Sequence, residues 1–220
     1  LLAIEGSLTL DVLTLAGGDV QIDSNNTGAS TLTVGQLRVV STGSSITGSN
    51  TTTPDDVLNI GTAGFDLQHS IEISGLTVNS TGTATMAPGF FDELNLTGNT
   101  TFNNAGTFEF QGSNAIVSSD GTGIFVNAGT LGNTGSNSSF IGSTATDSDL
   151  TFLNSDATIS VASGSEIEFR DGGTFDGATT LNTSGGTGKI DFNTGTFTVD
   201  VAASFQGVST GDRALFMENQ

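Results

Sequence analysis

A short phrase recurs along the second half of the chain, and this repetition restricts the possible folds more than any other feature of the sequence. The phrase consists of an apolar residue, a gap, Asn or Asp, a gap, Gly and Thr. Its copies begin at Phe102, Phe125, Phe152, Phe169 and Phe192, at intervals of 17 to 27 residues. Repetition at such intervals is the sequence signature of proteins built from stacked coils.

The repeat predicts two ladders of side chains. The mean spacing is about 22 residues, and each coil of a solenoid makes its main contacts with its neighbours, so like residues should lie over like residues. We expect a ladder of phenylalanines in the interior, formed by Phe102, Phe125, Phe152, Phe169 and Phe192. We also expect a polar ladder at a turn, with each side-chain amide bonded to the copies above and below. Its expected members are Asn59, Asn104, Asn127, Asn154, Asp171 and Asn193.

Alternating apolar and polar residues predict short strands between these turns. The clearest windows are 107–111, 158–161, 165–169 and 196–201, and Gly, Asn, Asp and Ser separate them. No window predicts an amphipathic helix, and we expect residues 87–94 to form a loop. The pattern therefore predicts one all-β domain over residues 1–220, a parallel β-helix of about ten coils of about 22 residues. A β-sandwich or barrel is the alternative, because short strands at regular spacing also fit those folds.

The composition excludes several classes of partner. The chain of 220 residues has 23 acidic and four basic side chains, and its formal charge is −19. Nucleic acids and anionic membrane surfaces need clustered Lys and Arg, so we expect neither, whereas divalent cations such as Ca²⁺ are plausible ligands. No apolar run has the length of a membrane span, so we expect no membrane insertion. The absence of Cys excludes disulfides and thiolate metal sites, and it favours an exported bacterial protein.

Two segments resemble a known class of repeat. The sequences FNNAGTFEF (residues 102–110) and FVNAGTLGNTGS (residues 125–136) are similar to coils in filamentous haemagglutinin-type and autotransporter-type bacterial surface proteins. The resemblance is clearest from about residue 78 to residue 200. It implies a right-handed parallel β-helix in an extracellular or cell-surface protein that is adhesive or part of a surface coat.

One cluster of charged residues is compatible with an enzymatic function. Glu166 and Glu168 alternate with apolar residues, as Lys189 and Asp191 do one coil later. Stacking would then place Glu166 beside Lys189 and Glu168 beside Asp191. The simpler interpretation is a surface ion pair worth about 0–1 kcal/mol, beside an acidic pair that could attract a cation.

Pectate-lyase-like enzymes share the expected architecture and use an Arg or Lys base beside Ca²⁺-binding acids. Here Arg170 or Lys189 would be the base, and Glu168, Asp171 and Asp191 would hold the Ca²⁺. Sugar rings usually stack on aromatic side chains, and the chain has neither Trp nor Tyr. We therefore expect no catalytic site, no cofactor and no metal, and these three acids are weak candidates for a calcium site.

The sequence favours a structural or adhesive, non-enzymatic segment of an exported bacterial surface or filament protein. Both ends of the chain are apolar and lack the polar cap that a free solenoid needs. We expect the rod to continue, either in a longer parent chain or by end-to-end association of subunits. A cell-surface glycan or protein is the other expected partner. The alternatives are a polysaccharide lyase-like enzyme and a calcium-stabilised adhesin rod.

Overall fold

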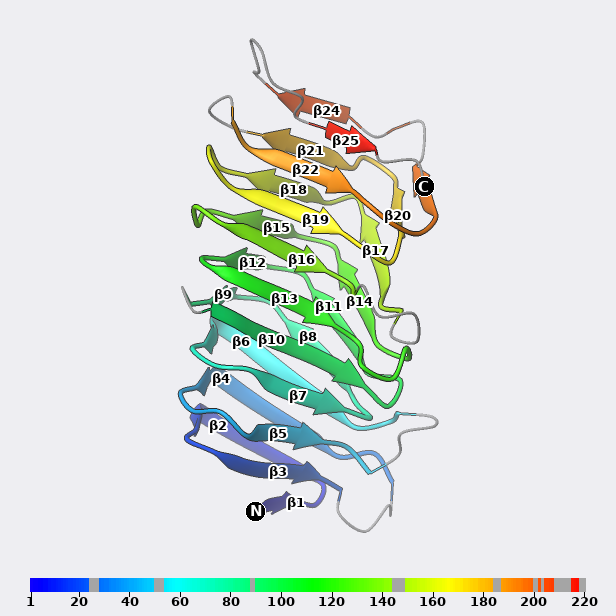
Figure 1. The fold of residues 1–220 in the computed structure, drawn as a ribbon. Helices are drawn as coiled ribbons and strands as arrows, with labels where there is room; N and C mark the ends of the chain where they lie inside the picture. Colours follow the sequence, from blue (N-terminus) through cyan, green and yellow to red (C-terminus); the bar gives the residue numbers. More distant parts are fainter. Residues whose placement is uncertain are drawn as a thin grey trace.

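A computed structural model shows an all-strand solenoid. It describes residues 1–220 except 24–27, 50–53, 88–89, 144–148, 184–186, 200–201, 203, 208–214 and 218–220. The described residues contain 25 strands and no helix, and every strand pairs with its neighbours in parallel. The strands stack in two sheets along one axis, with β1 at one end of the rod and β24 and β25 at the other (Figure 1). The prediction of a parallel β-solenoid is confirmed.

One sheet, here called sheet A, contains one strand from each winding of the chain. Its neighbouring strands lie in chain order, so each new winding adds a strand to the same edge. The ten strands are, in order, β1 (Leu2–Ile4), β3 (Gly18–Ile22), β5 (Ser44–Thr47), β7 (Ile71–Ser74), β10 (Phe90–Thr97), β13 (Ser113–Val117), β16 (Ser138–Ile141), β19 (Glu166–Phe169), β22 (Lys189–Phe192) and β25 (Leu215–Met217).

The second sheet, sheet B, covers the other side of the interior. It starts as a column of long strands, and later windings contribute two short strands each. The long strands are β2 (Ser7–Leu15), β4 (Thr31–Val39) and β6 (Val57–Leu67). The first column of short strands is β8 (Thr77–Ser80), β11 (Thr101–Asn104), β14 (Ile124–Asn127), β17 (Thr151–Ser155), β20 (Gly173–Asp176) and β23 (Phe197–Val199). The second column is β9 (Thr83–Met86), β12 (Thr107–Phe110), β15 (Thr130–Asn133), β18 (Thr158–Val161), β21 (Thr180–Thr183) and β24 (Ser204–Gly207).

The change from two to three strands per winding occurs at β6. Its first half, Val57–Ile60, pairs with β8, and its second half, Phe65–Leu67, pairs with β9. From β8 onward a corner therefore divides sheet B into two columns. The prediction of about ten coils is too high, since the described strands make about seven full turns.

Glycines at this new corner let successive coils approach closely. Gly82, Gly106 and Gly129 lie one above another, and a Cβ added to Gly106 or Gly129 would lie well inside 3.0 Å of the backbone oxygen of the preceding glycine. None of the three belongs to the described glycines with positive φ. These glycines are needed because a side chain would separate the coils, whereas Gly195 of the last copy has a positive φ of 95°.

The interior is apolar and continuous from β2 to β22. Inward residues alternate with outward ones along each strand, as in β12, where Phe108 and Phe110 are buried and Thr107 and Glu109 are not. Phenylalanine rings fill the middle of the rod, and the aliphatic residues Leu32, Val34 and Leu37 fill the β4 winding. One hydrophobic cluster thus connects all the windings.

Acidic side chains hold the corners of the rod. The carboxylates of Asp56, Asp92, Asp120, Asp156 and Asp171 each accept a hydrogen bond from a backbone N–H of a different segment, over 2.7–3.1 Å. A buried backbone N–H without a partner is costly, and corners leave such groups outside the sheet ladders. Part of the acidic composition therefore serves the architecture.

Candidate functional site

Three of the predicted asparagines form a buried ladder. Asn104, Asn127 and Asn154 occupy one register position in β11, β14 and β17. The Nδ2 of Asn104 donates to Oδ1 of Asn127 over 2.8 Å, and the Nδ2 of Asn127 donates to Oδ1 of Asn154 over 2.7 Å. All three side chains are completely buried, and Asn154 ends the ladder by donating to Oγ1 of Thr179. This inner ladder is a structural element inside the rod.

Asn59 belongs to a different ladder from the one predicted. Its register partner is Asn79, which pairs in turn with Asn103 on the outward side of the same strands. In this outer ladder the Nδ2 of Asn103 donates to Asn79, and the Nδ2 of Asn79 donates to Asn59, each over 3.0 Å. The assignment of Asn59 was wrong by one residue, and the inner position of its strand is occupied by Ile60. The N–H groups of the outer ladder point toward β1, whereas those of the inner ladder point toward β24.

The phenylalanines are divided between the two sheets. Phe102, Phe125 and Phe152 stack in sheet B, with ring centroids 5.2 and 6.1 Å apart and interplanar angles of 7° and 10°. Phe169 and Phe192 stack on each other in sheet A, with centroids 5.5 Å apart. Phe152 and Phe169 meet across the interior with centroids 5.0 Å apart. The predicted single ladder was wrong because the 17-residue interval between them is shorter than one full winding.

Asp171 and Asn193 also lie outside the inner ladder. The Oδ2 of Asp171 accepts backbone N–H groups of Ser143 and Leu150, each over 2.9 Å. Asn193 donates through Nδ2 to Oε1 of Glu168. Both residues follow a strand of sheet A, so their copies of the phrase match the others by sequence and differ in their place in the coil.

The charged cluster on the outer face of sheet A has the predicted register. Glu166 pairs with Lys189 and Glu168 pairs with Asp191. The Nζ of Lys189 lies 2.6 Å from both a Glu166 carboxylate oxygen and Oδ2 of Asp191. The guanidinium of Arg170 donates two hydrogen bonds of 3.0 Å to the carboxylate of Glu168. Each described cation of this face is therefore held by carboxylates.

These contacts stabilise the charged forms of both partners. Burial alone would raise the pKa of Glu168, but hydrogen bonds from Arg170 and Asn193, with the positive charges of Arg170 and Lys189, hold that pKa below its usual value. Partial burial would lower the pKa of Lys189, but the hydrogen bonds to Asp191 and Glu166 outweigh it and raise that pKa. A general base must lose its proton near the working pH, so this environment does not favour Lys189 as a base.

The three weak candidates for calcium ligands do not come together as a site. Glu168 binds Arg170, Asp191 binds Lys189, and Asp171 accepts two backbone N–H groups. Within the part of the chain that the structure describes, no group of three or more His, Cys, Asp or Glu side chains could hold a metal ion. Ca²⁺ needs several oxygen ligands that converge, and each of these three acids already has an oxygen bonded to a protein donor.

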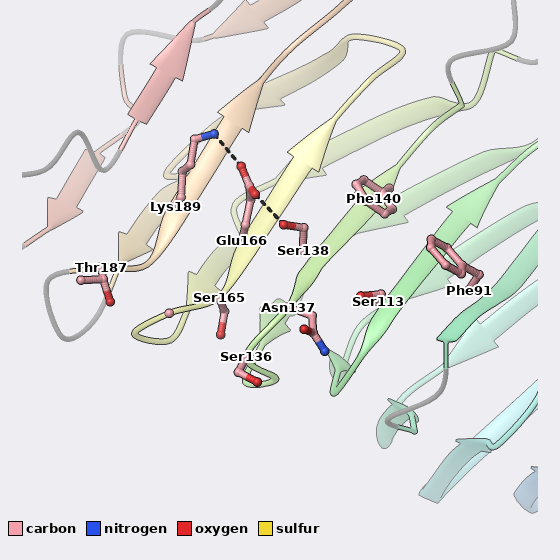
Figure 2. Close-up of a pocket in the computed structure, with 11 residues that line it drawn as sticks. Phe91, Ser113, Ser136, Asn137, Ser138, Phe140, Ser165, Glu166, Thr187 and Lys189 are labelled. Atoms are coloured by element: carbon pink, nitrogen blue, oxygen red, sulfur yellow. Dashed lines mark hydrogen bonds and ion pairs between the residues drawn. The ribbon is translucent and has the colours of Figure 1, made fainter.

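A groove runs over the outer face of sheet A beside this cluster. One hollow of about 510 Å³ and a second of about 310 Å³ share Phe91, Ser113 and Phe140 as lining residues. Figure 2 shows the side chains of Phe91, Phe140, Glu166 and Lys189 on one face of the sheet, on β10, β16, β19 and β22. We call this hollow the Phe91–Phe140 groove.

The sequence did not predict this groove. Residues 87–94 were expected to form a loop, but β10 begins at Phe90, and a register shift between Phe90 and Glu93 makes a bulge. Phe91 lies in this bulge with a φ of 62° and 71 % of its surface exposed. For Phe140 a signal did exist: it precedes the inward-facing Ile141, and alternation therefore places Phe140 outward.

The comparisons with known proteins identify no relative. No family model matches the chain, and no significant match is found among curated proteins or solved structures. Among the described residues, no helix has the length and apolar character needed to cross a membrane.

Proposed function

We propose that this chain is a structural and adhesive, non-enzymatic segment of an exported bacterial surface or filament protein. Its rod would be a right-handed parallel β-helix of the filamentous haemagglutinin and autotransporter type. Parallel strands joined by crossovers are right-handed in nearly all known folds, which supports this hand. The repeat phrases support an extracellular location, as does the absence of Cys, which is common in large bacterial surface proteins that cross membranes unfolded.

The observation that carries the proposal is the open edge at β2. This strand pairs with β4 alone, and its inner residues Leu8, Leu10 and Leu13 are only partly buried. Their register partners one winding later, Leu32, Val34 and Leu37, are completely buried. The register pairs are Leu8 with Leu32, Leu10 with Val34, and Leu13 with Leu37. One further coil over β2 would complete the burial of these leucines.

An unpaired edge of this kind is a template for another strand. The added coil would come from a longer parent chain or from the opposite end of a second copy, where β24 and β25 are the last described strands of their columns (Figure 1). Contacts between unlike ends make linear filaments when the rotation between subunits does not close into a ring, as in end-to-end stacking of a straight rod. A rod that lengthens by stacking its ends is a suitable element for a surface coat or fibre.

The test is association in solution. We expect sedimentation equilibrium to show concentration-dependent, elongated oligomers of the wild-type chain. Leu10→Lys places a charge on the inner side of the edge and should shift the chain to monomer. Val12→Lys is the matched control, since Val12 is 52 % exposed on the same strand and should leave association unchanged. A stable wild-type monomer at every concentration would contradict the end-to-end proposal.

The non-enzymatic part of the proposal has a separate test. We expect no cleavage when the chain is incubated with polygalacturonate and Ca²⁺ and the products are measured by reducing-end and unsaturated-uronate assays. Cleavage that disappears in both Arg170→Ala and Lys189→Ala would show the lyase-like alternative to be right.

A further inference from the structure

Two phenylalanine side chains lie on the outer face of sheet A, and small side chains line the surface between them. Phe91 projects from the bulge of β10, and Phe140 projects from β16. Between them lies β13, where Ser113 and Ala115 face outward and line the hollows. Ala115 is the register partner of Phe140 on one side and of Glu93 on the other. Figure 2 shows the two rings on either side of Ser113.

The separation of the rings follows from the fold. The strands β10, β13 and β16 are consecutive in sheet A, so Phe91 and Phe140 are two strand steps apart, about 10 Å along the rod axis. This is about the length of two sugar residues in an extended glycan. A chain lying along the axis could therefore place alternate sugar rings over the two phenylalanines.

The exposure of Phe91 is unusual for its residue type. Its φ of 62° lies in the left-handed region, which is an outlier for a bulky residue, and most of its surface is open to solvent. Strained backbone of this kind concentrates at ligand-binding positions. Neither burial nor backbone preference explains a phenylalanine here, whereas contact with a ligand would.

The charges of the groove favour an uncharged ligand. The guanidinium of Arg170 lies 3.5 Å from the centroid of Phe140 and is bonded to Glu168. Lys189 is bonded to Glu166 and Asp191. Both cations are thus compensated, and the formal charge of −19 on the whole chain would repel a polyanion.

Hydroxyl and amide groups complete the lining. Ser136, Asn137, Ser138, Ser165 and Thr187 line the larger hollow beside the two rings. The hydroxyl of Ser138 already donates to Glu166, and that of the buried Ser165 donates to the backbone oxygen of Gly135. The exposed side chains of Ser136, Asn137 and Thr187 can pair with sugar hydroxyls, because hydroxyl and amide groups both donate and accept. Aromatic faces with adjustable polar groups around them suit a ligand that is itself apolar on its ring faces and polar at its edges.

We propose that the Phe91–Phe140 groove binds a neutral polysaccharide chain that lies along the rod axis. The inference gives the adhesive part of the proposed function a class of ligand, and to that extent it rests on the proposed function. Phe91 and Phe140 stack against sugar rings, and the exposed side chains of Ser136, Asn137 and Thr187 bond sugar hydroxyls. Arg170 is a positioning residue that fixes the ring of Phe140 while Glu168 holds its charge.

The experiment uses the full chain on an array of immobilised hexasaccharides. The neutral probes are β-1,4-glucan, β-1,4-xylan, β-1,4-galactan and α-mannan, and the acidic probes are polygalacturonate and hyaluronan. We expect retention on at least one neutral probe. Isothermal titration with that probe should show at least a tenfold weaker Kd for Phe91→Ala, for Phe91→Gly and for Phe140→Ala.

Matched variants separate loss of the ring from loss of the fold. Phe91→Gly suits the positive φ and should melt no lower than the wild type, so a loss of binding in this variant comes from the missing ring. Phe91→Tyr keeps a ring and should bind within about threefold of the wild type. Val199→Ala removes another exposed apolar side chain, in β23, and should bind like the wild type.

Three outcomes would overturn the inference. They are no retention on any neutral probe, retention on acidic probes alone, or binding that survives both Phe91→Gly and Phe140→Ala. The end-to-end association of the rod depends on β2 and is measured separately by sedimentation. A failure of glycan binding is therefore distinguishable from a failure of the structural role.

Discussion

The side-chain amide of Asn127 donates a hydrogen bond of 2.7 Å to Oδ1 of Asn154, and both residues are completely buried between coils of the rod. Asn127 also accepts a hydrogen bond from Asn104. The same three residues are aligned in the backbone register of the sheet. The side-chain amide bonds and the backbone hydrogen bonds therefore hold successive coils in the same register. Such a ladder opposes slippage of one coil against the next, because any shift would leave buried amides without partners.

Asn127→Ala should lower the free energy of unfolding by about 3 kcal/mol, since it leaves polar groups of Asn104 and Asn154 buried with fewer partners. Asn79→Ala is the matched control. Asn79 makes the equivalent bonds in the outer ladder, where water can replace them, so its loss should cost less than about 1 kcal/mol. Urea denaturation followed by circular dichroism measures both. Equal losses in the two variants would contradict the structural role assigned to the inner ladder.

Ser80→Asn should stabilise the rod by about 1 kcal/mol. Ser80 is the register partner of Asn104, and both Oγ of Ser80 and Oδ1 of Asn104 are buried without a hydrogen-bond partner among the described residues. An Asn at position 80 would donate to Asn104 and extend the ladder by one coil. The melting temperature measures the effect. Ser80→Ala is the control and should not raise it; a drop in melting temperature for Ser80→Asn would show that the coil has no room for the amide.

Gly129→Ala should lower the free energy of unfolding by about 2 kcal/mol or more, because the added methyl group would be forced against the backbone of Gly106. Gly132→Ala is three residues away in β15 and has its nearest neighbour at 3.7 Å, an ordinary contact. This control should be neutral or more stable by up to about 1 kcal/mol, since Ala restricts the unfolded chain. The order of the two denaturation midpoints is the measurement, and the reverse order would contradict the close approach of the coils.

Asp120 should contribute stability that depends on pH. Its partial burial would raise its pKa, but hydrogen bonds from Gly98, Thr122 and Ser118 outweigh burial and lower that pKa. A carboxylate with a lowered pKa stabilises the fold above its unfolded pKa of about 3.9, and this contribution is lost as the pH falls through the folded pKa. Asp120→Asn should therefore melt lower than the wild type at pH 7, and the difference should disappear once the pH has fallen below the lowered folded pKa.

Asp171 provides the opposite control. Burial raises its pKa, despite hydrogen bonds from the backbone of Leu150 and Ser143, so its ionised form costs stability as the pH rises above its unfolded pKa. Asp171→Asn keeps an oxygen to accept those bonds and removes the charge. It should melt as high as the wild type or higher at pH 7. If Asp171→Asn melted below the wild type at pH 7 but not in acid, the negative charge of Asp171 would itself be needed for stability.

Removal of divalent cations should leave the rod unchanged. The candidate acids Glu168, Asp171 and Asp191 bond Arg170, backbone N–H groups and Lys189. We expect the melting temperature of dialysed protein to be the same in EDTA and in millimolar CaCl₂. A rise of several degrees in CaCl₂ that Asp191→Asn abolishes would favour the calcium-stabilised rod instead.

Much of the fold could be predicted because stacked coils repeat their chemistry. Phe102 and Phe125 occupy equivalent places, and the register of Glu166 with Lys189 followed from alternation alone. Phe169 was misplaced because its copy of the phrase comes from sheet A. When the loops between strands differ in length, two copies of the phrase can have the same residues and still lie on different sides of their coils.

The candidate site was harder to predict than the fold. The groove depends on the bulge at Phe91, where one register shift changes which side chain faces outward. Such a shift leaves no periodic trace in the sequence. The role of the aspartates that bond backbone N–H groups could not be predicted for a similar reason. Each accepts from a segment about one coil away, and the number of residues in between varies along the chain.

The two asparagine ladders meet at β11, and their opposite directions have an electrostatic consequence. Asn103 directs its N–H group toward one end of the rod, and Asn104 directs its own toward the other. The negative ends of both amide columns therefore coincide at this single coil, while their positive ends face away from it. Excising that coil would remove Asn103 and Asn104 together, so Oδ1 of Asn79 and the buried Oδ1 of Asn127 would each lose a donor. Shortening of such a rod should therefore be tolerated better away from β11 than at it.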